Sequence, residues 1–143
     1  MKIQQISLFA ENKPGHIAAP SRLLAQEGID IRALFLADNQ EYGILRMIVS
    51  DWQKAAAVLQ AQGFVIKVTE VLAVEVPDRP GGLADILGAL HGTGINIEYM
   101  YAFPYLRGDQ AILIFRFNDP DAAIAQLQTA GINLLASEEL LNI

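Results

Sequence analysis

The amino-acid sequence contains one ordered pair of short motifs twice. Residues 12–15 (NKPG) precede residues 28–31 (GIDI), and residues 78–81 (DRPG) precede residues 94–97 (GINI) at the same distance. The two pairs lie 66 positions apart, and beyond the middle of each half the offset becomes 68, which indicates a two-residue insertion in the second half. A unit that occurs only twice does not build a solenoid, which needs about three units or more. The sequence therefore predicts two small domains of one fold.

Length and composition fit this prediction, with the domains at residues 1–69 and 70–143. Each half is near the lower size limit for an independent core, so the halves should support each other. Hydrophobic residues make up 52% of the chain and charged residues 18%, which is typical of a globular protein. The formal net charge of −6 opposes binding to nucleic acid or to anionic lipid.

The absence of cysteine excludes disulfides, thiolate catalysis and cysteine metal sites. No stretch approaches the roughly 18 apolar residues that a membrane helix needs, and no signal-peptide pattern follows Met1. We therefore expect a cytoplasmic protein without membrane contact.

The second half reads as strand, helix, strand, strand, helix, strand. Leu83, Ile86, Leu87 and Leu90 have the spacing of one buried helical face, and Asp119 is a candidate N-cap for the next helix. The predicted strands are 72–76, 95–101, 111–117 and 132–136.

The first half has the same order, with a short turn at residues 38–41. Its predicted elements are strand 6–10, helix 15–27, strands 31–37 and 42–49, helix 52–62 and strand 64–68. Each half is thus an α+β unit of the ferredoxin-like βαββαβ type, an antiparallel sheet with both helices on one face.

The other face of each sheet is not predicted to be polar. Residues 34–36 (LFL) and 112–115 (ILIF) are apolar at consecutive positions, so both faces of these strands carry hydrophobic side chains. A second copy of the chain would cover such a face, which predicts a homodimer. The alternative is that the two halves of one chain cover each other.

No catalytic constellation is visible. His16 and His91 occupy non-equivalent positions of the repeats and lack the spacing of metal ligands, and no nucleotide-binding or nucleophile motif occurs. Glu138 and Glu139 are adjacent carboxylates that we interpret as a solvated terminal pair. The sequence predicts no catalytic residue, no metal site and no cofactor.

The loops at residues 12–15 and 78–81 each join a strand to a helix. Their glycine permits close approach of a ligand to the backbone, and the first turn of the helix presents unpaired N–H groups with partial positive charge. A carboxylate fits that place, although an ordinary tight turn would also explain a Pro-Gly pair.

These two pairs of motifs resemble those of the ACT domain, a βαββαβ regulatory module that typically binds amino acids. The resemblance covers almost the whole chain twice, and it is greatest to free-standing tandem ACT proteins. It implies two sheets joined edge to edge into one of eight strands. It also implies that the loop residue of one domain and the turn residue of its neighbour hold one amino acid at the seam between them.

Carried onto this sequence, the resemblance implies two unlike sites. One combines Asn12 with Asn96, whose neutral amides satisfy both ends of a zwitterion, with Gly15, His16 and Ile17 beside them. The other combines two carboxylates with the second loop. Its residues would be Asp30, Asp78, Arg79, Gly81, Gly82 and Leu83.

Two questions stay open on the sequence. Arg79 would either neutralise one carboxylate of the second site or leave that site to a cationic amino acid. Pro20 would either start its helix late or leave a carbonyl free near the first site.

The leading interpretation is an amino-acid sensor that regulates an enzyme or another protein. The alternative is a protein–protein interaction module that uses the apolar sheet face and binds no ligand. A third possibility, a small enzyme, would have to use His16, Asp30, Asp78 and Arg79.

Overall fold

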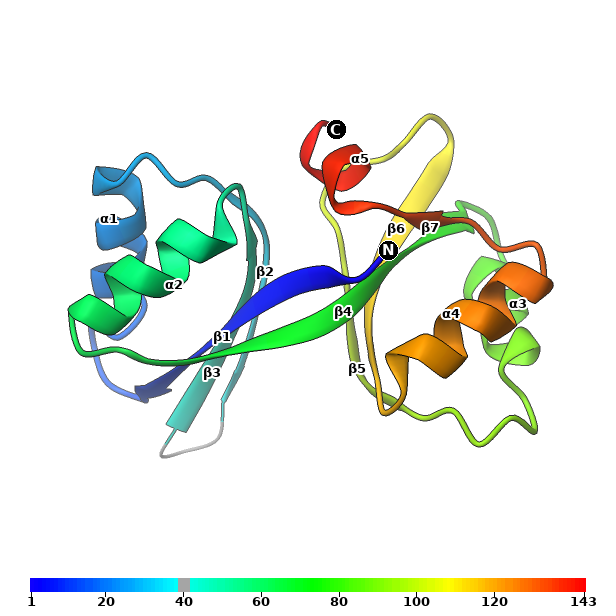
Figure 1. Ribbon diagram of the computed structural model, residues 1–143, viewed down its shortest axis with the longest axis horizontal. Helices are drawn as coiled ribbons and strands as arrows, with labels where there is room; N and C mark the ends of the chain where they lie inside the picture. Colours follow the sequence, from blue (N-terminus) through cyan, green and yellow to red (C-terminus); the bar gives the residue numbers. More distant parts are fainter. Residues whose placement is uncertain (39–41) are drawn as a thin grey trace. The chain divides into compact units, whose positions relative to one another are not determined.

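The computed structural model describes residues 1–38 and 42–143, so the tip of the predicted turn at residues 39–41 lies outside the described residues. Its contacts divide the chain into two compact units (Figure 1). The N-terminal unit comprises residues 4–69, and the C-terminal unit comprises residues 70–143 together with residues 1–3.

The N-terminal unit is a four-stranded sheet with two helices. Its strands stand in the order β2-β3-β1-β4, and β3 is antiparallel to both of its neighbours. The elements are β1 (Ile3–Glu11), α1 (Ala18–Gln26), β2 (Ile31–Asp38), β3 (Tyr42–Val49), α2 (Trp52–Ala61) and β4 (Val65–Pro77).

The C-terminal unit repeats this topology, with β4 now in the place of the first strand. Its strand order is β7-β4-β6-β5, and each neighbouring pair is antiparallel. The elements after β4 are α3 (Gly82–Ala89), β5 (Ile97–Ala102), β6 (Gln110–Phe117), α4 (Pro120–Thr129), β7 (Leu134–Leu135) and α5 (Ser137–Leu141). The predicted α+β class with two βαββαβ repeats is confirmed.

One strand, β4, replaces the two separate strands that the sequence analysis predicted at 64–68 and 72–76. No glycine, proline, asparagine or aspartate interrupts residues 65–76, and β4 ends at the first such residue, Pro77. The described residues therefore form seven strands where eight were expected, because β4 contributes to both units.

Each unit has its own hydrophobic core between the sheet and the two helices. Equivalent positions fill the two cores: Leu24 lies in α1 and Leu90 is the C-cap of α3, and Leu59 and Leu127 come from the second helices. All four are buried. Since both repeats bury the same positions, the repeat in the sequence is a repeat of the core.

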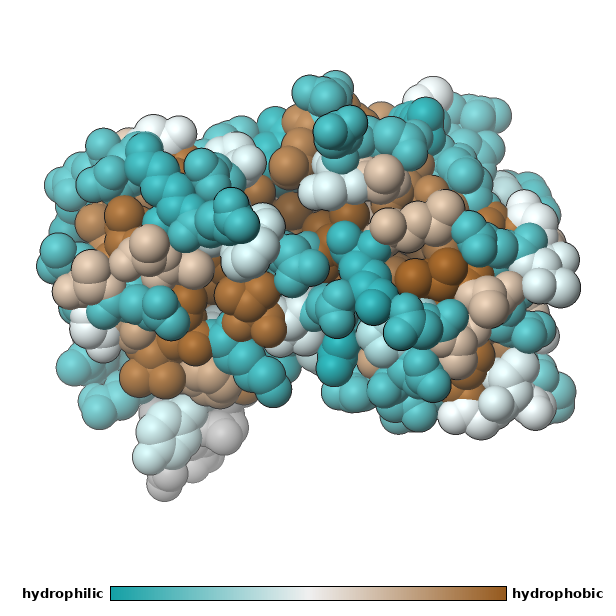
Figure 2. All heavy atoms as spheres, in the orientation of Figure 1, coloured by the Kyte–Doolittle hydropathy of each residue, from teal (hydrophilic) through white to brown (hydrophobic). Residues whose placement is uncertain are grey.

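The predicted buried face of α3 is only half correct. Ile86 and Leu90 are buried, whereas Leu83 and Leu87 are 39% and 41% exposed. The eight-residue helix α3 buries only a narrow stripe, so the flanking leucines remain at the surface. Figure 2 shows that apolar residues are scattered among polar ones on the face in view.

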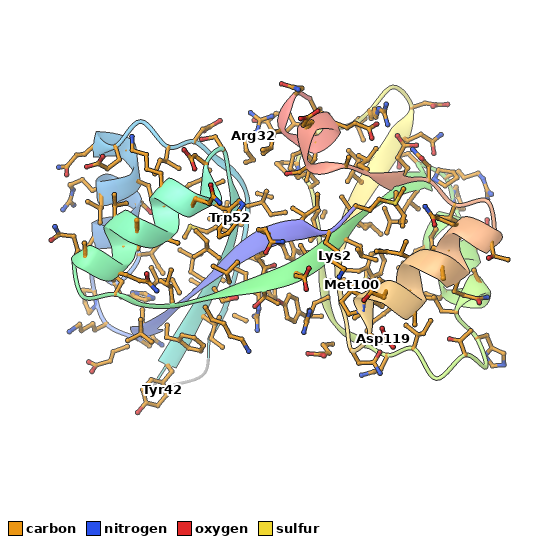
Figure 3. The ribbon with its side chains drawn as sticks, in the orientation of Figure 1. Lys2, Arg32, Tyr42, Trp52, Met100 and Asp119 are labelled. Atoms are coloured by element: carbon orange, nitrogen blue, oxygen red, sulfur yellow. The ribbon has the colours of Figure 1, made fainter. Side chains whose placement is uncertain are left out.

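The second helix of each unit has an aspartate N-cap. The Oδ1 atom of Asp51 accepts from the amide of Lys54, and that of Asp119 accepts from the amide of Ala122, both at 3.1 Å. Trp52 and Asp119 mark these two helix starts in Figure 3. The N-cap predicted at Asp119 is confirmed.

The edge strand β2 exposes two leucines. Leu34 and Leu36 pair with Met47 and Leu45 of β3, whose side chains face the helices, yet Leu34 is 55% and Leu36 42% exposed. They are on the helix side of the sheet, not on the opposite face. The helices of their own unit leave this edge uncovered.

Candidate ligand site

The first repeated loop joins β1 to α1 through a glycine turn. Gly15 has φ +84°, a conformation that favours glycine, and the amide of His16 donates to the carbonyl oxygen of Lys13 at 3.2 Å. The sequence predicted that this helix begins at residue 15, whereas α1 begins at Ala18. Pro20 is the third residue of α1, where its missing N–H breaks no intrahelical bond, so the helix starts late.

The N-terminus of α1, which we call the mouth of this helix, is open to a ligand. Its N-cap residue Ile17 makes no side-chain cap, and its first turn contains no acidic residue. The hydrogen bonds described for residues 1–38 and 42–143 do not use the amides of Ile17 and Ala18. These amides add to the partial positive charge that favours a carboxylate.

A cavity of about 250 Å³ lies behind this loop within the N-terminal unit. Its wall is largely apolar, and Glu11 and Lys13 stand at its rim with 3.7 Å between Nζ and Oε2. The lining residues are Phe9, Ala10, Glu11, Lys13, Pro14, Gly15, His16, Ala19 and Phe64. On its outer side, the loop forms a second, shallower hollow from residues 12–18.

His16 borders both hollows and carries an unsatisfied polar atom. Its Nε2 is buried and has no hydrogen-bond partner among the described residues. Buried nitrogen atoms are nearly always paired in native proteins, because an unpaired one costs about 1–3 kcal/mol. A ligand group would reach this atom after a rotation of the His16 ring toward one of the two hollows.

In the second repeated loop, an exposed ion pair joins the loop to the first turn of α3. Gly81 has φ +90° and is the N-cap of α3. The NH2 nitrogen of Arg79 lies 2.8 Å from Oδ2 of Asp85 in the first turn of α3, and NH1 donates to the carbonyl oxygen of Pro80 at 3.2 Å. One expectation was that Arg79 neutralises a carboxylate of the second site. Its partner is instead Asp85, and Asp78 is exposed.

The turn residues Asp30 and Asn96 are held by the same two-bond clamp. The amide of Asp30 donates to Oγ of Ser50 at 3.0 Å, and the amide of Ser50 donates to the carbonyl oxygen of Asp30 at 2.9 Å. In the second repeat, Asn96 and Asn118 form the equivalent bonds at 2.8 and 3.0 Å. The backbone is fixed in both turns, and both side chains are exposed.

The two turn side chains differ in what they contact. Asp30 lies 3.3 Å from NH1 of Arg32, whereas no described hydrogen bond uses the side-chain amide of Asn96. A β-bulge follows each turn, immediately after Ile31 in β2 and after Ile97 in β5. Bulges aim side chains locally and are frequent beside binding sites.

Glu139 is not the solvated terminal residue that the sequence indicated. Its carboxylate lies 3.1 Å from NH2 of Arg107, and Arg107 NH1 lies 2.9 Å from Oε1 of Glu75. Glu75 Oε2 also accepts from Nδ2 of Asn133 at 2.9 Å. This network ties the loop before β6 to β4 and α5, and the sequence missed it because its four residues are scattered over 65 positions.

Within residues 1–38 and 42–143, no group of three histidine, aspartate or glutamate side chains has the arrangement of a metal site. No helix in the same ranges has the length and apolar composition to cross a membrane.

Two βαββαβ units, each with a glycine loop at a helix mouth and a clamped turn, define a protein of tandem ferredoxin-like domains. The chain belongs to the ACT domain pair family, whose model matches residues 1–143. The resemblance deduced from the motifs is thereby confirmed. ACT domains are regulatory modules.

The chain is similar to several solved structures. Protein BT0572 from Bacteroides thetaiotaomicron is 37% identical with a TM-score of 0.92, and the match covers 100% of this chain and 98% of that one. The regulatory subunits of aspartate kinase from Thermus thermophilus (ligand-free form) and Thermus flavus are 21% and 19% identical. Their TM-scores are 0.61 and 0.59, with coverage of 89% and 90% of this chain and 91% and 92% of theirs, so they share its fold. No curated protein matches the chain.

Proposed function

We propose that this protein is a sensor that binds an amino acid at the first repeated loop and regulates an enzyme or another protein. The observation that carries the proposal is the difference between the two loops. The first has no acidic residue in the first turn of its helix and an unpaired buried nitrogen on His16, whereas the second has Asp85 in that turn, paired with Arg79.

The exposed Asn12 supplies an amide beside the first loop, and Asn96 supplies another from a clamped turn. In keeping with the ACT family, the proposed site is completed by the turn of a neighbouring ACT unit, and Asn96 is the residue suited to that role. The amide N–H groups would receive the ligand carboxylate and the amide oxygens its ammonium group. Binding then favours one mutual arrangement of domains through differential affinity.

Thermal unfolding with a panel of amino acids tests the proposal. A ligand at 100 times its dissociation constant stabilises the folded protein by about 2.7 kcal/mol. The variants Asn12→Ala and Asn96→Ala should lose this stabilisation, while the matched control Asp78→Ala in the second loop should retain it. Absence of stabilisation by every amino acid, or its loss in the control alone, contradicts the proposal.

We also propose a homodimer, with the edge strand β2 as one contact. Leu34 and Leu36 are exposed on this strand, and unpaired edges with exposed apolar residues favour association. Leu34→Lys together with Leu36→Lys should convert a dimer to a monomer in sedimentation equilibrium. A wild-type chain that is monomeric at all concentrations would exclude this dimer.

The same leucines favour the second candidate function, a protein–protein interaction module. Its partner would be a regulated enzyme, by analogy with the aspartate kinase regulatory subunits named above. We propose a cytoplasmic location, which agrees with a chain that has no cysteine and so forms no disulfide.

A further inference from the structure

We infer that the cavity behind the first loop selects amino acids with a large apolar side chain, aromatic or branched. This inference rests on the proposed function and adds the class of ligand to it. It is carried by the lining of the cavity and by a comparison with the equivalent cavity of the second repeat.

The two repeats have a cavity at the same place in the fold. In the C-terminal unit, a cavity of about 290 Å³ lies between the end of the first strand of the repeat, the mouth of α3 and the segment before β7. Its lining residues are Glu75, Pro77, Gly82, Asp85, Ile86, Gln110, Gly131, Ile132 and Asn133. Five of these are the repeat equivalents of Phe9, Glu11, His16, Ala19 and Phe64 in the first cavity.

Equivalent positions of the two cavities carry opposite chemistry. Phe9 corresponds to Glu75, and Ala19 corresponds to Asp85. Both carboxylates of the second cavity are engaged, Glu75 by Arg107 and Asn133 and Asp85 by Arg79. The second cavity therefore contains two carboxylates that the protein itself satisfies, and the first cavity has no carboxylate at either position.

Phe9, Ala19 and Phe64 supply apolar lining of the first cavity, with Phe9 44% exposed. Its two charged lining residues, Glu11 and Lys13, have 72% and 67% of their side-chain surfaces accessible and pair with each other. A charged ligand side chain would lose its hydration there without gaining a partner, whereas an apolar side chain gains by leaving water.

Size restricts the occupant further. About 250 Å³ is below the roughly 300–1,000 Å³ of pockets for drug-sized ligands, so the cavity fits a group of the size of one amino acid. His16 and Gly15 border both this cavity and the outer hollow of the loop. A ligand whose charged groups meet the loop at Nε2 of His16 can thus direct its side chain toward Phe64.

Calorimetric titration of the full chain with single amino acids tests the inference. We expect L-phenylalanine, L-leucine or L-isoleucine to bind at least tenfold more tightly than glycine, L-lysine or L-aspartate. The variant Ala19→Leu fills the cavity from an exposed helical position and should weaken binding of the large apolar ligand at least tenfold. The control Ala25→Leu makes the same change in α1 at an exposed residue that lines neither hollow, and it should leave the dissociation constant unchanged.

The outcomes separate this inference from the proposed function. If a charged amino acid binds most tightly, or if Ala19→Leu binds the large apolar ligand as the wild type does, the cavity does not select the side chain. The proposed function survives that result as long as Asn12→Ala still abolishes binding. If no amino acid binds the wild-type chain, both are refuted. Far-ultraviolet circular dichroism verifies that Ala19→Leu is folded, and the selectivity of the wild type tests the inference without any variant.

Discussion

Gly82 is the position at which a single added methyl group should disturb this fold most. A Cβ atom at Gly82 would lie 2.3 Å from the carbonyl oxygen of Pro77 and 3.1 Å from Cγ1 of Val76. Cβ atoms keep at least 3.0 Å from other atoms, so the backbone would have to shift by about 0.7 Å, the difference between 3.0 and 2.3. The Pro77 carbonyl also accepts from the amide of Arg79 at 2.8 Å, which resists this movement.

We therefore expect Gly82→Ala to destabilise the C-terminal unit by about 2–3 kcal/mol, since overpacking of a rigid site typically costs about 1–3 kcal/mol and a backbone hydrogen bond is strained as well. For a domain of this size, the melting temperature should fall by roughly 10 °C. Gly88→Ala is the matched control in the same helix. Nothing lies within 4 Å of a Cβ at Gly88, so the substitution should stabilise by up to about 1 kcal/mol through helix propensity.

Urea unfolding followed by two signals gives the measurement. Circular dichroism reports on both units, whereas the single tryptophan, Trp52, belongs to the N-terminal unit. Gly82→Ala should shift the circular dichroism midpoint more than the fluorescence midpoint if the units unfold separately. A free energy of unfolding for Gly82→Ala within 0.5 kcal/mol of the wild type, with Gly88→Ala behaving as expected, would refute the steric argument.

Further predictions concern the caps, the charge network and the N-terminus. Asp51→Ala and Asp119→Ala should each lower the free energy of unfolding in urea by about 1 kcal/mol. A variant as stable as the wild type would contradict the capping role of that aspartate. Arg107→Gln should lower the free energy of unfolding by up to about 1 kcal/mol, because the pair with Glu75 is partly exposed. A double-mutant cycle with Glu75→Gln measures the coupling energy of this pair, and a coupling energy of zero would refute a stabilising role of the network. The hydrogen bond to a carboxylate of α4 raises the pKa of Lys2 above 10.5, so its contribution to stability is complete below pH 10.5 and disappears as the pH rises through the raised folded value. Lys2→Met should therefore lose less stability than the wild type in alkaline titration, and an identical loss would exclude this contribution.

The fold was predictable because the signals are local and occur twice. The spacing of apolar residues identified the helices, and glycines at the helix ends located the turns. Because each element occurs in both repeats, its second copy supported the assignment of the first. Errors arose where an element depends on its neighbours, as in the junction of two strands into β4 and in the short helix α5.

The candidate site was predictable only in part. The motifs located the first loop and His16, but nothing in them indicated the cavity, because Phe9, Ala19 and Phe64 come from three separate elements. The sequence indicated that the two sites differ, because Asp78 and Asp30 stand where the first site has Asn12 and Asn96. It did not show that Arg79 would pair with Asp85, a residue outside the second motif.

The sequence by itself determined that this chain folds as two ACT units, since periodicity, glycine turns and N-caps act over a few residues. The tertiary structure decided how the two repeated loops differ. Position 82 must be glycine because its Cβ would collide with the backbone at Pro77, whereas the equivalent His16 precedes a helix that starts later and has room for its ring. Such a difference depends on distances between segments that are remote in sequence, and only packing sets those distances.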